Sequence, residues 1–443
     1  MVSNLLDESI QKNLVNKFNE LIEYVMQSSP YYSELYNKMD PKLNSLEDLI
    51  NIPYTLRKDL YEFYPFGYLC KSKGKLPAYF ETSGSTGNPI PVFPDLSTEK
   101  TENFAKFLDY WMGIKKSRID LAIVALPYEM NPMGLKYHSA LISLGVTVIP
   151  ASVRTTLCSP KKLISLIQNL KPGLLIGRPM EIMRYAEGMQ LMGIDPKECS
   201  IRKIFLTGET MSNAKWERIQ ELYGGVEIYS TYGLTELDTG LISCSKHHYH
   251  LPNSANLIVE IVNDKGEYVG ENETGEVIIT TLEKGFAPLI RYKTEDIGKF
   301  HTNCDCYEFN TPYIELLGRK ADRKEYNNTT VFPKDIENIL LSDSNIGCEY
   351  QMIINDKKLI IKAEKAYGCE LNNEEIKNIL KNKIEILGIN PEIEILEFNS
   401  IADKFGIAKT KGCRFFDISG MDEKTAEKAL KINICNGEDL NWL

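Results

Sequence analysis

The stretch IRKIFLTGETMSNAKWERIQELYGGVEIYSTYGLTELDTG (201–240) determines the fold class, because two different periodicities alternate within it. An apolar run, IRKIFL, ends in Thr-Gly-Glu and is followed by the amphipathic segment AKWERIQELYG. A second apolar run, VEIYSTYG, comes next. Strand, helix and strand in this order predict neighbouring strands of a largely parallel sheet, joined by a crossover helix.

The same alternation extends upstream to about residue 81. The runs DLAIVALP, VTVIPA and LLIG have the length and composition of strands, whereas KKLISLIQNL and PMEIMRYAEGMQLMG have helical patterns. Residues 1–80 are predicted to form helices and turns, beginning with a packed helix whose apolar positions are Leu14, Phe18, Ile22 and Met26. We therefore expect a helix-covered, largely parallel sheet over residues 81–240.

The sequence pattern changes after residue 256. Here NLIVEIV, EYVG and GEVIITTLE alternate with Asp-Lys-Gly and Glu-Thr-Gly turns, which predicts three strands in an antiparallel or barrel-like part. From about 320, the strands YQMIIN, KLIIKAE and EIEILEF and the helix LNNEEIKNILKNKIEIL, capped by Asn372 or Asn373, predict a small α+β module. The expected fold class is α/β, with a large N-terminal domain (1–319) and a small mobile C-terminal domain (320–443).

Composition excludes several classes of protein. The 443 residues are 43% hydrophobic and 25% charged, as in soluble globular proteins, and no apolar run reaches the roughly 20 residues of a membrane span. The formal charge of −10 argues against a nucleic-acid surface. Ten cysteines at this length do not suggest a disulfide framework. Because the N-terminal segment has no apolar signal-peptide core, the expected location is the cytoplasm. A homodimer is the assembly that we consider.

The segment ETSGSTGNP (81–89) has the residues of a phosphate-binding loop. Its glycines permit tight backbone turns, and its hydroxyl and amide groups can donate hydrogen bonds to phosphate oxygens. It contains no lysine and is not a P-loop, which would require Gly-Lys-Ser/Thr. Taken alone, an ordinary polar turn is the more frequent explanation.

Three further segments follow the loop in order: IYSTYGLTELDTG (228–240), LIRYKTEDIGKF (289–300) and LLGRKADRK (316–324). Together with TSGSTG, this order resembles the adenylate-forming superfamily of acyl- and aryl-CoA ligases. YYSELY, LEDLINIPYTLRKDLYEFYPFG and VFPKDIE are most similar to its phenylacetate–CoA ligase branch, up to about Asp417. The resemblance implies that Mg-ATP activates a carboxylate to an acyl-adenylate, and the expected substrate is an aromatic acid. The acyl group then passes to a thiol, with coenzyme A the expected acceptor.

The resemblance also implies a role for each motif residue. The phosphate loop would hold the β- and γ-phosphates, Thr235 the α-phosphate and Glu236 the Mg²⁺ ion, a hard cation suited to carboxylate oxygen. Tyr232, before Gly233, would stack on adenine, and Asp296 would accept hydrogen bonds from both ribose hydroxyls. Arg319 would lie near the ribose or phosphates. Gly208 and Glu209 would form another wall of the pocket that binds the carboxylic acid. The loop residues are Thr82, Ser83, Gly84, Ser85, Thr86 and Gly87.

A C-terminal lysine would carry the adenylation step. The family pattern G-K-x-x-R-x-x-D corresponds here to T-K-G-C-R-F-F-D, which places Lys411 in register with Arg414 and Asp417. Lys411 would stabilise the charge that develops on the carboxylate and α-phosphate. Because Thr410 replaces the usual glycine, Lys409 remains the rival.

The acid pocket is expected in LPYEMNPMGLKYHSALISLG (126–145), by resemblance to a family segment that lines the acid with an aromatic residue, a glycine and a histidine. Methionine adapts to irregular cavities, so the altered residues before the glycine would reshape the site. A lone helical histidine is more often structural than catalytic, and His138 is treated as pocket lining. The expected pocket residues are Tyr128, Met130, Asn131, Met133, Gly134 and His138.

Cysteines and histidines gather in SCSKHHYH and HTNCDCY. Thiolate and imidazole donors in a set of four suit structural Zn²⁺, and some members of the phenylacetate–CoA ligase branch look similar here. The predicted ligands are Cys244, His250, Cys304 and Cys306, against the alternative of reduced surface thiols.

The chain departs from the family after the Gly-Arg pair, where Asn328 replaces a glycine of the loop that lines the pantetheine tunnel. Asparagine tolerates the left-handed backbone better than most residues, so the turn can survive. The change nevertheless keeps two alternatives open: an amine or a carrier-protein thiol as acceptor, and a nucleotide-binding protein whose catalysis has lapsed. Ala321 or Asp322 is the expected hinge, and the tail after Asp417 has no assignment.

Overall fold

The structure, a computed structural model, describes residues 5–71, 73–82, 89–237, 239–251, 256–326, 329–355, 358–408, 414–430 and 434–435. The chain divides into two compact units, each built from separate segments. Unit 1 comprises Met1–Arg118, Pro127–Val146 and Tyr229–Ala321, and unit 2 comprises Ile119–Leu126, Thr147–Ile228 and Asp322–Leu443. The division at residue 319 stays a prediction. None of the helices in the described ranges is long and apolar enough to cross a bilayer.

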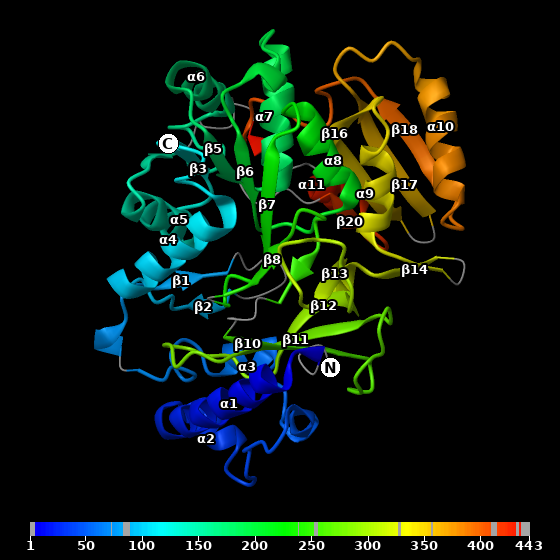
Figure 1. Cartoon of the computed structure of the whole chain (residues 1–443). Coiled ribbons are helices and arrows are strands. Elements are labelled where there is room, and N and C mark those ends of the chain that lie inside the picture. The colour runs from blue at the N-terminus through cyan, green and yellow to red at the C-terminus, as the bar shows by residue number, and fades with distance from the viewer. Residues whose placement is uncertain are drawn as a thin grey trace. The chain divides into compact units, whose positions relative to one another are not determined.

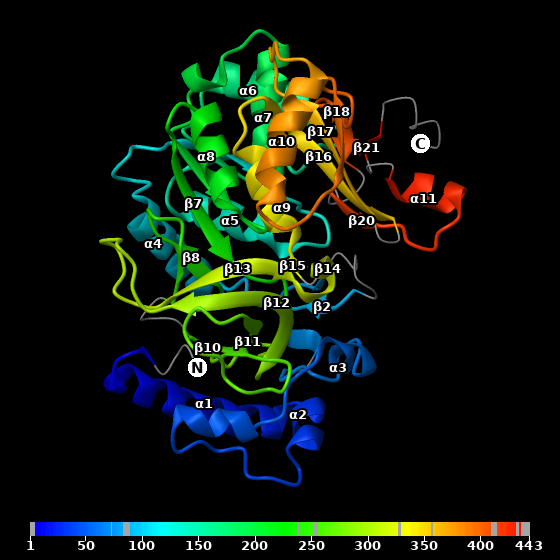
Figure 2. The same ribbon diagram turned by 90° about the vertical axis from the view of Figure 1, so that its right-hand side faces the viewer.

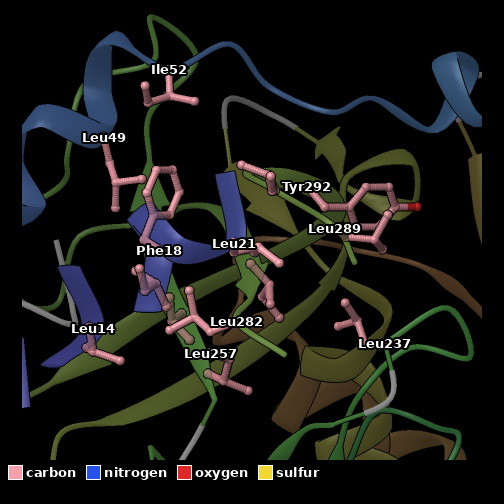
Figure 3. Close-up of a cluster of buried hydrophobic side chains, with 14 of the residues drawn as sticks. Leu14, Phe18, Leu21, Leu49, Ile52, Leu237, Leu257, Leu282, Leu289 and Tyr292 are labelled. Atoms are coloured by element: carbon pink, nitrogen blue, oxygen red, sulfur yellow. The ribbon is translucent and has the colours of Figure 1, made fainter. Parts of the chain in front are cut away.

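The N-terminal helix packs as its apolar spacing predicts. Leu14, Phe18 and Ile22 are buried along one face of α1, because residues three and four apart share a helix face. Figure 3 shows Phe18 and Leu21 in one cluster with Leu49, Leu257 and Leu282. The helices of unit 1 are α1 (Glu8–Ser28), α2 (Pro30–Leu35), α3 (Arg57–Glu62), α4 (Thr98–Met112) and α5 (Pro132–Ser143), with short 3-10 helices at Leu46–Asn51 and Lys73–Lys75.

The strands of unit 1 form an antiparallel sheet with the order β10-β11-β12-β13-β9-β8-β7, and a separate β1-β2 hairpin. The predicted strand EYVG is wrong: only Tyr268 makes an isolated bridge, to Val262. The segment cannot extend because the chain turns at once, with the N–H of Gly270 donating to Glu273. The strands are β1 (Phe80–Glu81), β2 (Pro91–Val92), β7 (Glu227–Tyr232, whose last four residues belong to unit 1), β8 (Leu241–Ser243), β9 (Tyr249–His250), β10 (Leu257–Val262), β11 (Gly275–Thr281), β12 (Tyr292–His301) and β13 (Tyr313–Arg319).

Unit 2 contains the predicted parallel sheet, with the order β6-β5-β3-β4 (Figure 1). Every residue of β5 and β6 is buried, as expected for strands that helices cover on both faces. The elements are β3 (Leu121–Ala125), β4 (Thr147–Pro150), α6 (Pro160–Leu170), β5 (Leu174–Gly177), α7 (Pro179–Leu191), β6 (Lys203–Leu206) and α8 (Asn213–Leu222), with a 3-10 turn at Pro196–Glu198.

The last part of unit 2 is a four-stranded sheet with the order β18-β17-β16-β20, on which α9 and α10 pack (Figure 2). Asn372 caps α10: its side chain accepts from the N–H of Glu375, which confirms the first of the two predicted caps. The elements are β14 (Lys324–Tyr326), β15 (Thr329–Val331), α9 (Pro333–Leu341), β16 (Ile346–Asn355), β17 (Lys358–Lys365), α10 (Asn373–Glu385), β18 (Glu392–Leu396), β19 (Ile407–Ala408), β20 (Phe415–Asp417), α11 (Glu423–Leu430) and β21 (Ile434–Cys435), preceded by a 3-10 turn at Lys320–Asp322.

Candidate active site

The two ends of the phosphate loop meet at the β1-β2 hairpin of unit 1. The N–H of Thr82 donates to the carbonyl of Ile90 (2.9 Å), and the N–H of Ile90 donates to the Thr82 hydroxyl (2.9 Å). These two hydrogen bonds join the residues at either end of the predicted loop. The loop residues Ser83, Gly84, Ser85, Thr86 and Gly87 lie outside the described residues.

The turn between β7 and β8 carries Thr235 and Glu236. Tyr232 and Leu241 are paired across the two strands, so the turn begins and ends at adjacent points. Gly240 has to be a glycine here, because a Cβ atom at this position would lie 2.3 Å from the Tyr232 carbonyl oxygen. The pairing of Tyr232 with Leu241 and the close packing of Gly240 therefore fix the position at which the turn bearing Thr235 and Glu236 leaves the sheet.

Glu236 is held by two residues that sequence reasoning gave no role. The Tyr292 hydroxyl donates to Glu236 Oε1 (2.8 Å), and Arg57 Nη1 lies 3.9 Å from the same oxygen. Burial and the adjacent Glu236 carboxylate hold the pKa of Tyr292 well above its usual range, so its phenol stays protonated and donates. Carboxylate and hydroxyl oxygens are the donors that Mg²⁺ prefers, and Thr235 and Glu236 fit such an ion.

A small cavity of about 120 Å³ adjoins these residues within unit 1. Thr235, Glu236 and Thr239 line it, together with Ile90 and Pro91 at the exit of the phosphate loop. The residues that follow the predicted phosphate loop and those predicted to hold α-phosphate and Mg²⁺ thus line one cavity.

Three of the predicted nucleotide residues are hydrogen-bonded to one another. The Tyr232 hydroxyl donates to Asp296 Oδ2 (2.8 Å), and Arg319 Nε lies 3.0 Å from Asp296 Oδ1. Asp296 and Arg319 are paired across β12 and β13, which explains why residues 23 positions apart meet. Burial and the Asp296 carboxylate raise the pKa of Tyr232 well above its usual range. A carboxylate fixed on both oxygens is positioned to accept further hydrogen bonds from a diol.

The predicted acid-pocket segment forms a loop and the start of α5. The Asn131 side chain caps the helix by accepting from the N–H of Met133 (2.9 Å), and the carbonyl of Met130 accepts from the N–H of Glu81 (3.1 Å). Gly134 packs against Pro127, where a Cβ would lie 2.5 Å from the carbonyl oxygen. Tyr128 and His138 are 3.2 Å apart, from hydroxyl to Nδ1. All six predicted residues therefore lie in one short segment beside β1.

Gly208 and Glu209 lie in unit 2, directly after β6. Gly208 has φ of +84°, a conformation that favours glycine, and Glu209 Oε2 accepts from the N–H of Met180 at the start of α7 (3.3 Å). Lys411, the proposed catalytic lysine, and its rival Lys409 lie outside the described residues.

The cysteine and histidine segments come together in unit 1. The ligand atoms of Cys244, His248, His250 and Cys304 all lie within 4.8 Å of one another. The Cys244 and Cys304 sulfur atoms are 3.8 Å apart, about the edge of a tetrahedron with Zn–S bonds of about 2.3 Å. Cys306, the fourth predicted ligand, lies beside the cluster, with its sulfur 3.6 Å from His250 Nε2.

The imidazole of His250 is oriented as a metal ligand would be. It is fully buried, and its Nδ1–H donates to the carbonyl of Thr311 (2.8 Å), so that the lone pair of Nε2 faces the cysteine sulfurs. Sequence reasoning did not select His248, yet a signal was present: in an extended segment, residues 248 and 250 point to the same face. The donor set of sulfur and imidazole nitrogen fits Zn²⁺.

The fold and this site define a nucleotide-dependent ligase, and comparisons with known proteins agree. The model of the AMP-binding enzyme family matches residues 77–282, and that of the AMP-binding enzyme C-terminal domain matches residues 328–418. The chain belongs to the adenylate-forming enzymes of this family and is an AMP-forming ligase.

The relatives with assigned functions are phenylacetate–coenzyme A ligases. The chain is 28% identical to a phenylacetate–coenzyme A ligase of Thermus thermophilus, over 79% of each chain. It is 25% identical to the phenylacetate–coenzyme A ligase of Escherichia coli, over 93% of this chain and 95% of that protein. Among solved structures, 2-hydroxyisobutyryl-CoA ligase in the postadenylation state superposes with a TM-score of 0.82 at 19% identity, covering 94% of this chain and 90% of that chain.

Proposed function

We propose that this protein joins a carboxylic acid, most suitably an aromatic one, to coenzyme A in two steps at the expense of ATP. A carboxylate oxygen first attacks the α-phosphorus of ATP, and the bond to the β-phosphate breaks to release pyrophosphate. The thiol of coenzyme A then attacks the acyl carbonyl, AMP leaves, and the thiol proton is lost to solvent. The observation that carries the proposal is the hydrogen-bonded set Tyr232, Asp296 and Arg319 beside the turn that presents Glu236.

Each group has a role that its surroundings support. Asp296 would bind the ribose hydroxyls, with Tyr232 and Arg319 fixing its carboxylate. Thr235 and the loop between Thr82 and Ile90 would bind phosphate oxygens. Glu236 and Thr235 would hold Mg²⁺, which neutralises phosphate charge when bound. Tyr128, Gly134 and His138 would line the acid; the role of Gly208 and Glu209 in this pocket stays a prediction.

The experiment that tests the reaction is ATP–pyrophosphate exchange with aryl, arylacetic, short-chain and amino acids. Exchange with one class establishes the first step and names the acid. Addition of coenzyme A, a holo carrier protein or amines then identifies the acceptor. Nucleotide binding without exchange for any acid would contradict the proposal and favour a lapsed enzyme.

Lys411 is the proposed adenylation residue. Lys411→Ala should lower adenylation on the order of 10²- to 10³-fold, because a charge that stabilises the transition state is lost. Lys409→Ala is the matched control and should have little effect. Equal adenylation by the Lys411 variant and the wild type would remove this residue from the mechanism.

We further propose that Cys244, His248, His250 and Cys304 hold a structural Zn²⁺ ion, with Cys306 as the alternative fourth ligand. Metal analysis of protein purified without added zinc should give about one Zn²⁺ per chain, since four donors complete a structural site. Cys304→Ser should lose the metal, whereas Cys158→Ser, which changes a half-buried cysteine of unit 2, should keep it. Retention of zinc by the Cys304 variant would contradict this ligand. A cytoplasmic location and a homodimer stay predictions.

A further inference from the structure

We propose that Arg57 is a binding residue for the β- and γ-phosphates of ATP, and so for the pyrophosphate that leaves. This role rests on the proposed function, and it goes beyond the motif residues. Arg57 comes from α3, far before the phosphate loop in the sequence, yet its guanidinium lies 3.9 Å from Glu236 Oε1.

Backbone contacts place Arg57 beside Glu236. Thr55 forms a parallel bridge with Tyr292: its N–H donates to the carbonyl of Arg291, and its carbonyl accepts from the N–H of Lys293. The Thr55 hydroxyl also donates to the carbonyl of Ile290 (2.6 Å). Because Tyr292 in turn donates to Glu236, the start of α3 is tied to the residue that holds the proposed Mg²⁺ ligand.

The side chain of Arg57 is held but not satisfied. Its Nε donates to the Tyr61 hydroxyl one turn later (2.7 Å), and the side chain is 15% exposed. Within the described part of the chain, neither Nη group has a hydrogen-bond acceptor, since 3.9 Å to Glu236 is too long for one. The guanidinium therefore presents four N–H donors that suit phosphate oxygens bidentately.

The charge of the site favours the same role. The triphosphate carries several negative charges, but the segment 81–89 contains neither lysine nor arginine. The two lysines that line the adjacent cavity are paired: Lys100 with Glu283 (2.6 Å) and Lys284 with Glu20 (3.0 Å). Among the described residues, the carboxylate that lies within 4 Å of Arg57 is that of Glu236, which a bound Mg²⁺ would occupy. Arg57 would then be free to contact phosphate.

The test compares ligands that contain or lack the β- and γ-phosphates. Calorimetry measures binding of MgATP, magnesium pyrophosphate and AMP to the full-length wild type, Arg57→Ala and Arg57→Lys. The matched control is Lys58→Ala, which removes an exposed cation from the next position of the same helix. Circular dichroism establishes that each variant is folded.

We expect Arg57→Ala to weaken MgATP and pyrophosphate binding on the order of 10- to 100-fold, as for loss of hydrogen bonds to a charged group. AMP binding should not change. Arg57→Lys should recover part of the loss, because the charge returns without the bidentate geometry. Lys58→Ala should bind all three ligands as the wild type does.

Two results would overturn the assignment. Equal weakening of AMP and ATP would mean that Arg57 only supports Glu236 or the fold, and unchanged ATP binding would mean that it does not touch the phosphates. Because binding is measured without an acid, failure of pyrophosphate exchange in the wild type would count against the proposed function alone. A wild type that binds neither nucleotide would overturn both.

Discussion

At the scale of single residues, buried tyrosine hydroxyls differ in whether they have an acceptor. Within the described ranges, the hydroxyls of Tyr36 and Tyr185 are buried without a hydrogen-bond partner, whereas Tyr223 donates to the carbonyl of Ile182 (2.9 Å). Tyr36→Phe and Tyr185→Phe should raise the free energy of unfolding by about 1 kcal/mol each, since an unsatisfied polar group leaves the core. Tyr223→Phe, the control, should lower it by about 1 kcal/mol. Denaturant unfolding measures these values, and equal losses for Tyr185 and Tyr223 would contradict the difference.

The second prediction at this scale concerns Gly240. Gly240→Ala would force a Cβ to within 2.3 Å of the Tyr232 carbonyl oxygen, so the backbone of the turn must shift. The free energy of unfolding should fall by about 1–3 kcal/mol, as for other overpacked sites, and AMP should bind more weakly because Tyr232 moves with the turn. Gly74→Ala is the control, because its Cβ would meet no atom within 4 Å. Wild-type AMP affinity in the Gly240 variant, measured by calorimetry, would show that the turn accommodates the methyl group.

Sequence could predict only part of the site, and the reason lies in how each residue is placed. Tyr232, Asp296 and Arg319 each sit in a motif, and strand pairing brings them together. Tyr292 reaches Glu236 through its own hydroxyl, and the backbone bridge between Thr55 and Tyr292 brings Arg57 there; neither contact leaves a local sequence pattern.

At the scale of elements, a buried ion pair joins α7 to β16 within unit 2. Arg184 Nε and Nη2 donate to the two carboxylate oxygens of Glu349, and Arg184 Nη1 donates to Glu181 (2.7 Å). Burial opposes ionisation of Glu349, but the charge and hydrogen bonds of Arg184 outweigh it and keep its pKa below the usual range. Arg184→Met should lower the free energy of unfolding by about 3–5 kcal/mol, since it removes the hydrogen-bonded partner of two buried carboxylates. Among the described cations, Glu349 then keeps only Arg414 (3.7 Å) and Glu181 only Arg154 (3.7 Å) within 4 Å, both beyond hydrogen-bond distance.

The double variant Arg184→Met, Glu349→Leu separates charge from packing. It should recover a large part of the stability that Arg184→Met loses, because replacing both members of a buried pair by apolar residues is often tolerated. Denaturant unfolding of both single variants and the double variant completes the cycle. A double variant as unstable as the sum of the single variants would show that the pair is not coupled.

The elements that sequence predicted well are those with long, clear periodicity. The alternation predicted over 81–240 is confirmed over 121–232, where every predicted strand and helix forms, whereas Phe80–Glu81 and Pro91–Val92 pair as an antiparallel hairpin. The signal is clearest for β5 and β6, because strands buried on both faces are apolar throughout. EYVG failed because a run of four residues can satisfy the strand pattern without finding a partner: only Tyr268 bridges to Val262. Burial of Arg184 and Glu349 had no sequence signal, since charged side chains usually face solvent.

At the scale of the whole molecule, the buried tyrosines should make the free energy of unfolding fall as the pH rises in the alkaline range. The chain has 24 tyrosines, and burial raises the pKa of many of their phenols, among them Tyr32, Tyr36, Tyr137, Tyr223, Tyr232 and Tyr249. Above the ordinary phenol pKa of about 10, the unfolded chain therefore loses protons that the folded chain retains. Because stability falls with pH wherever the unfolded state binds fewer protons, each such tyrosine should remove up to about 1.4 kcal/mol per pH unit. The stability that the raised pKa values give is thus present below pH 10 and lost as pH rises toward them.

The measurement follows the ultraviolet absorbance of phenolate and circular dichroism together, from pH 8 to 12. Exposed tyrosines such as Tyr110 and Tyr307 should ionise gradually, and the buried ones in one cooperative step that coincides with loss of secondary structure. Tyr36→Phe removes one buried phenol, so its free energy of unfolding should fall less steeply with pH than that of the wild type. Complete phenolate formation near pH 10 with native circular dichroism would mean that solvent reaches these rings in the folded protein. Cooperative ionisation would instead show that the tyrosines are protected by the same packing that holds Tyr232 and Tyr292 in the candidate site.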